Sequence, residues 1–70
     1  MDIHQQIAEL AAELAATRLT KNERASVVRQ LHELQRQLEI DEAVALENGD
    51  AVTADALYER WIRIENALAA

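Results

Sequence analysis

An all-α fold is predicted by three features of this 70-residue sequence. It contains no Pro and a single Gly, so few positions would break a helix. Ala, Leu, Glu, Gln and Arg, the strong helix formers, dominate it. Its large apolar residues recur at intervals of three and four, which is the period of one helix face. We therefore expect a single helical domain over residues 1–70 with three helices.

The first helix is predicted over residues 2–16. Its apolar residues fall at spacings of four, three and four, the narrow seam of a packed helix: Ile3, Ile7, Leu10 and Leu14. Thr20, followed three places later by Glu23, forms a capping-box pattern. A second helix should therefore begin at residue 21.

The second helix is the longest and is predicted over residues 21–47. It should end at Asn48-Gly49, because Gly readily takes the left-handed conformation that terminates helices. Thr53 is the expected N-cap of a third helix over residues 54–69, with Val52 and Leu57 forming a hydrophobic staple.

The turn between the second and third helices is short, so the two should pack as an antiparallel hairpin in which facing residue numbers add to roughly 100. The first helix is expected to cover the N-terminal half of the second. The hairpin core is predicted from the two apolar stripes: Leu31, Leu34, Leu38, Ala45, Leu57, Trp61, Ile64 and Leu68.

Four further apolar residues lie off these stripes. Ile40 and Val44 point away from the core side of the second helix, and Tyr58 and Ile62 widen the apolar arc of the third. Chains this short bury a small core and are marginal alone, which favours self-association. We expect these residues to form a subunit or partner interface in a two-fold homodimer. The alternatives are that the first helix covers them or that they are scattered surface residues.

Charge is distributed unevenly along the sequence, whose formal net charge is −6. Basic residues dominate residues 17–36, whereas residues 37–57 carry only acids. This distribution opposes the helix macrodipole but suits an antiparallel partner, whose basic half would face the acidic half. Neutralisation of the basic segment by acids of the first helix is the alternative. The acids assigned to the partner or dimer interface are Glu39, Asp41, Glu42 and Glu47.

No arrangement for catalysis, metal binding or cofactor binding is expected. There is no Cys, and Ser26 lies six residues from His32 on one predicted helix, so their side chains diverge. His4 and His32 lack the spacing of a zinc motif. The negative net charge disfavours direct nucleic-acid binding, and no apolar run is long enough to span a membrane. A non-enzymatic, cytoplasmic protein-binding role remains.

The tract 38–50, LEIDEAVALENGD, leads into a helix that bears Trp61. In this tract, its size and its helical layout, the chain resembles the small acidic phage proteins that bind host regulators, most nearly the phage quorum-sensing anti-activators. The resemblance implies a homodimer in the host cytoplasm. It would bind the DNA-binding region of a LuxR-type transcription activator, with a pilus-assembly ATPase as a second target, and block each by occupation.

The expected function is therefore that of a small acidic inhibitor that occupies a basic surface of a regulator. Two alternatives stay open. The chain could be a structural subunit or secretion-type chaperone that covers a segment of its partner. It could also be a DNA mimic, because its acidic block resembles a phosphate backbone in charge.

Overall fold

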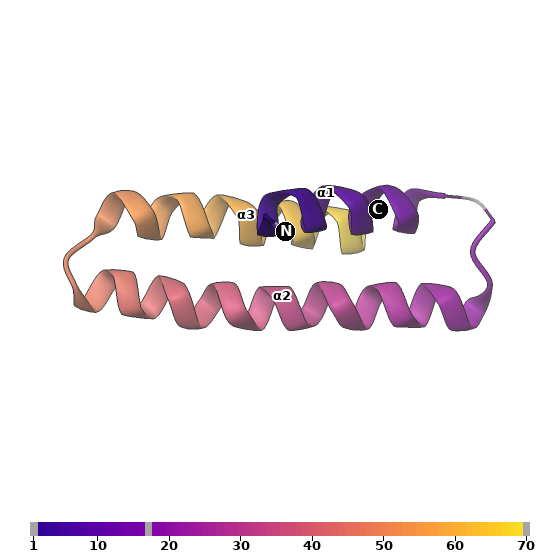
Figure 1. Cartoon of the computed structure of the whole chain (residues 1–70), viewed down its shortest axis with the longest axis horizontal. Coiled ribbons are helices and arrows are strands. Elements are labelled where there is room, and N and C mark those ends of the chain that lie inside the picture. The colour runs from indigo at the N-terminus through magenta and orange to yellow at the C-terminus, as the bar shows by residue number, and fades with distance from the viewer. Residues whose placement is uncertain (1, 17, 70) are drawn as a thin grey trace.

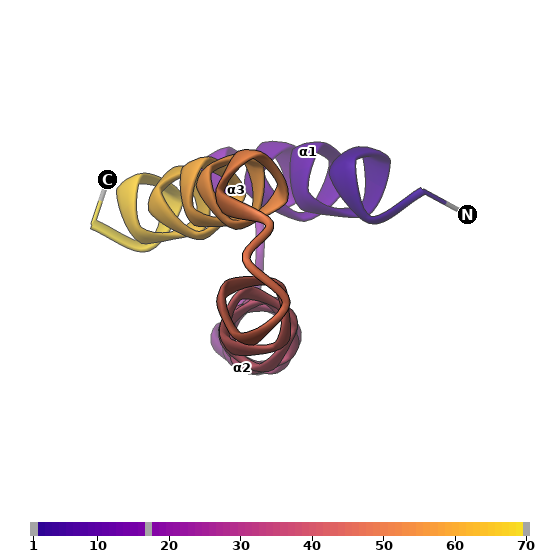
Figure 2. The ribbon, with the colours of Figure 1, turned by 90° about the vertical axis from the view of Figure 1, so that its left-hand side faces the viewer.

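The three helices form two layers (Figure 1). The computed structural model describes residues 2–16 and 18–69, so the predicted domain extends one residue beyond them at each end. Helix α2, Lys21–Glu47, forms one layer alone. Helices α1, Ile3–Ala15, and α3, Ala51–Ala69, lie side by side in the other layer (Figure 2). All regular secondary structure in the described residues is helical, as predicted.

Two helix starts are fixed by side-chain caps. The Thr20 hydroxyl accepts a hydrogen bond from the backbone N–H of Glu23 at 3.1 Å, which starts α2 at the predicted residue. The Asp2 carboxylate caps α1 by accepting from the N–H of His4 at 3.3 Å. Helix α1 is one residue shorter at each end than the predicted 2–16, because Asp2 and Ala16 are its extended caps.

The predicted start of α3 at residue 54 is wrong. The helix begins at Ala51, and Asp50 rather than Thr53 caps it, with its carboxylate accepting from the N–H of Thr53 at 3.1 Å. Hydrogen bonds from the Thr53 hydroxyl and then from its N–H lower the pKa of the Asp50 carboxyl. Val52 therefore lies in the first turn, where it is 83% exposed, so it does not form the predicted staple.

Gly49 makes the turn between α2 and α3 possible. Its φ of 72° is the only positive value among the described residues, and a Cβ there would meet nothing within 4 Å. We expect Gly49→Ala to lower the free energy of unfolding by about 1–2 kcal/mol through backbone strain alone. Urea unfolding would measure this. Asn48→Ala, at a negative φ next to it, is the control, and an equal loss there would contradict the argument.

The hairpin of α2 and α3 has the predicted antiparallel register. Gln35 Nε2 donates to the Glu65 carboxylate at 2.9 Å and to the Trp61 carbonyl at 3.5 Å. The first pair of residue numbers adds to 100 and the second to 96, close to the expected value. The packing between these two helices is the most extensive in the molecule.

The core lies between the two layers. Ile7, Leu31, Leu38 and Ile64 are each fully buried, and Ala45 is 7% exposed. The predicted hairpin core is therefore buried at Leu31, Leu38, Ala45 and Ile64. The remaining four predicted core residues are half-buried along its edges: Leu34, Leu57, Trp61 and Leu68.

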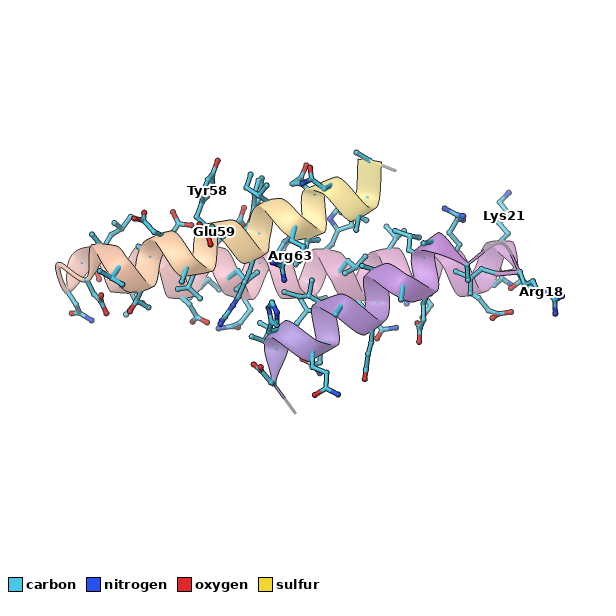
Figure 3. The ribbon with its side chains drawn as sticks, turned by 90° about the horizontal axis from the view of Figure 1, so that it is seen from above. Arg18, Lys21, Tyr58, Glu59 and Arg63 are labelled. Atoms are coloured by element: carbon cyan, nitrogen blue, oxygen red, sulfur yellow. The ribbon has the colours of Figure 1, made fainter. Side chains whose placement is uncertain are left out.

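Helix α1 lies along the N-terminal half of α2, as expected (Figure 1), but α2 is not the only helix that it contacts. It packs against both α2 and α3 of its own chain, and its His4 ring lies 3.2 Å from Arg63 Nη1. In Figure 3 Arg63 points from α3 toward α1. The reason is length: at 1.5 Å per residue, 19-residue α3 extends for about 28 Å along α2, so α1 shares the layer with it.

Candidate protein-binding surfaces

The structure divides the predicted interface residues between two surfaces. Ile40, Val44 and Tyr58 are about half-exposed, at 52, 50 and 51%, whereas Ile62 is half-buried. Ile40 borders a hollow formed by α2 alone, whereas Tyr58 borders a hollow between α2 and α3. The predicted interface residues therefore do not form one continuous patch on a single copy of the chain.

Ile40 belongs to the side of α2 that faces away from the other helices. At 100° per residue, Ile40 lies about 160° around the helix from the buried Leu38, and Val44 lies about 120° from Leu38. Figures 1 and 2 show that neither α1 nor α3 covers this side. Ile40 borders a shallow hollow whose lining comes from α2 alone: Arg29, His32, Glu33, Arg36, Gln37 and Ile40. We call this side the outer face of α2.

Tyr58 instead lines a hollow between α2 and α3. Glu39, Glu42, Tyr58 and Trp61 enclose about 210 Å³ there, and we call it the aromatic–acidic hollow. The Tyr58 and Trp61 rings are nearly parallel, with centroids 6.2 Å apart and planes inclined by 8°. Tyr58 projects from the edge of α3 that faces away from α1 (Figure 3). The hollow thus combines aromatic surface with two carboxylates.

Trp61 has a second role that the sequence did not indicate. We predicted it as a hairpin core residue, and it is half-buried, yet its ring also lines the aromatic–acidic hollow. Its indole Nε1 is buried without a hydrogen-bond partner. A buried donor left unpaired costs about 1–3 kcal/mol, so ring packing rather than hydrogen bonding holds this side chain. The sequence feature that could have indicated it is the spacing of three residues between Tyr58 and Trp61, which places both rings on one side of α3.

The four predicted interface acids also separate. Glu39 and the half-buried Glu42 border the aromatic–acidic hollow. Glu47 is exposed and lies about 180° from Leu38, on the outer face of α2. Asp41 is half-buried and accepts a hydrogen bond from Gln37 Nε2 at 3.0 Å, one turn earlier on the helix.

A third concavity lies between α1 and α2 and was not predicted. It measures about 440 Å³, with Leu10 and Leu34 among its lining and carboxylates at Glu9, Glu13 and Glu33. The acids of α1 therefore meet another acid along this groove.

The polar residues considered for chemistry are separated. The Ser26 hydroxyl oxygen accepts a hydrogen bond from Gln30 Nε2 at 3.4 Å, and His4 lies against Arg63. Within residues 2–16 and 18–69, no group of three or more His, Asp or Glu side chains is arranged to hold a metal ion. None of the helices in this part of the chain is both long enough and apolar enough to cross a membrane.

Comparison with known proteins does not place the chain in a family. No protein-family model matches the chain, and neither a curated protein nor a solved structure shows significant similarity to it.

Proposed function

We propose that this protein is a non-catalytic inhibitor that, as a homodimer, binds a basic surface of another protein. The observation that carries the proposal is the aromatic–acidic hollow, where half-exposed Tyr58 lies beside Glu39 and Glu42. A few residues, often aromatic, contribute most of the binding energy of a protein interface. Carboxylates around such residues favour cationic partners.

The hollow suits an Arg or Lys side chain from the partner. A guanidinium or ammonium group is attracted to the face of an aromatic ring, and Tyr58 offers such a face at the rim. Glu39 and Glu42 would accept charge-assisted hydrogen bonds from the same group. The all-acidic charge of residues 37–57 would speed the approach of a basic surface.

DNA-reading surfaces are the basic surfaces that we propose as targets. They carry Lys and Arg to bind phosphates, so occupying them blocks DNA binding. The resemblance to phage anti-activators makes the DNA-binding domain of a LuxR-type activator in the host cytoplasm the first target to test. A pilus-assembly ATPase is the second.

The test is binding of Tyr58→Ala to a purified LuxR-type DNA-binding domain, measured by calorimetry. We expect affinity to fall about tenfold or more, because truncating an interface aromatic removes its desolvated contact. Far-UV circular dichroism should be unchanged, since Tyr58 is half-exposed. The unaltered protein should also displace the domain from its DNA.

Val52→Ala is the matched control, because Val52 is an exposed apolar residue of α3 outside the aromatic–acidic hollow. Its affinity should equal that of the unaltered protein. Unchanged binding by Tyr58→Ala would remove the hollow from the proposal. If an affinity pull-down with the unaltered protein recovered nucleic acid rather than protein, that result would contradict the proposed class of function.

A further inference from the structure

The outer face of α2 carries a seam that the proposed inhibitor surface does not use. Its members are spaced four, three and four residues apart and are all exposed: Arg36, Ile40, Ala43 and Glu47. At 100° per residue they fall within an arc of about 60° centred opposite Leu38. This is the spacing of a coiled-coil seam, with one basic end, an apolar middle and one acidic end.

We infer that this seam binds the same seam of a second copy, antiparallel and about a two-fold axis. Facing residue numbers would add to 83, so Arg36 faces the second copy's Glu47 and Ile40 faces the second copy's Ala43. The inference rests on the proposed homodimer and assigns its interface. Val44, half-exposed at the edge of the seam, would flank the contact beside the second copy's Gln37.

Charge complementarity identifies the occupant as a second copy. A two-fold contact pairs residue i with j and j with i. A seam with Arg at one end and Glu at the other therefore forms two Arg–Glu pairs with a second copy, one at each end. A partner of uniform charge would match one end and oppose the other. The apolar centre, Ile40 with 52% of its surface exposed, is then covered in both copies.

The apolar residues select this register. Moving the copies by one heptad would place Arg29 opposite the second copy's Glu47, but it would set Arg36 against the second copy's Ile40. That register desolvates a charged group beside an apolar side chain without pairing it. The favoured overlap spans only about three helical turns, which is small for a protein interface, so association in the micromolar range is expected.

The dimer leaves the inhibitor surface open. The hollow on the outer face of α2 and the aromatic–acidic hollow have no lining residue in common. Each copy of the dimer would therefore present its own Tyr58, and the two surfaces can be tested independently.

The experiment is a charge exchange followed by sedimentation equilibrium over a micromolar concentration series. Arg36→Glu alone and Glu47→Arg alone each place like charges at both ends of the contact, so each should raise the dimer dissociation constant on the order of tenfold. The double variant should dimerise like the unaltered protein. An equimolar mixture of the two single variants should form a heterodimer, because both of its end pairs are then opposite in charge.

Arg29→Glu is the matched control, since Arg29 lies on the same face but outside the overlap. It should leave the dissociation constant unchanged, and circular dichroism should show that every variant stays helical. A monomer at all concentrations, or single variants that dimerise normally, would overturn the inference. Rescue of Arg29→Glu rather than Arg36→Glu by Glu47→Arg would overturn the register. None of these outcomes affects the Tyr58 test.

Discussion

Replacing Leu38 by Ala is expected to lower the free energy of unfolding by about 2–5 kcal/mol. Leu38 is fully buried in the hairpin core, so its truncation removes apolar contacts and leaves a cavity. A domain of this length has a total stability of roughly 4–10 kcal/mol. The substitution should therefore remove a large share of it and leave a measurable unfolded population.

Urea unfolding monitored by circular dichroism would measure the loss. It should be carried out at one fixed protein concentration, because dimerisation adds to apparent stability by mass action. Leu46→Ala is the matched control on the same helix, since Leu46 is 58% exposed. Its effect should stay within about 0.5 kcal/mol. Comparable losses for the two variants would contradict the assigned core.

The burial of Leu38 also explains why the helical layout could be predicted from the sequence. Leu31, Leu38 and Ile64 recur at helical spacing on their stripes, and each is fully buried. Such periodicity is a local property of one helix and needs no knowledge of its neighbours. The cap at Thr20 is local as well, because the Glu23 N–H that it accepts lies three residues away.

The start of α3 was missed because two capping residues compete there. Asp50 and Thr53 both favour the N-cap position, and the apolar pattern favoured the later one. The turn decides between them: with Gly49 in the left-handed conformation, the chain enters the helix directly at Ala51. Spacing alone did not contain this information.

Gln35 marks a different limit of the apolar pattern. It lies between Leu31 and Leu38 at spacings of four and three, so it occupies the seam, yet it is polar and was omitted from the predicted core. The structure buries it to 6% exposure and pairs it with Glu65 and the Trp61 carbonyl. A buried polar residue paired across a helix interface helps to fix one register.

The candidate surfaces were predicted residue by residue but not as groups. The half-exposure of Ile40 and Tyr58 agrees with their positions off the apolar stripes. A helical wheel gives the direction of a side chain on its own helix, but it does not give the direction from which the next helix approaches. Only the packed structure separates the outer face of α2 from the aromatic–acidic hollow.

Helix α1 yields the second large expected effect. Ile7→Ala should lower the free energy of unfolding by about 2–5 kcal/mol, because Ile7 is fully buried in the cluster that joins all three helices. An isolated helix of this length is marginal in water, and α1 has 13 residues. Helix α1 therefore depends on tertiary contacts, and Ile7 and Leu14 are its buried ones.

Native-state hydrogen exchange would locate this loss as well as measure it. The amides of α1 should lose protection before those of α2 in Ile7→Ala, because the hairpin keeps Leu31, Leu38 and Ile64 packed after α1 detaches. Gln5→Ala, on the exposed side of α1, is the control and should leave protection unchanged. Simultaneous loss across all three helices would instead show that α1 and the hairpin form one cooperative unit. Retained protection in α1 would contradict the position of Ile7 in the core.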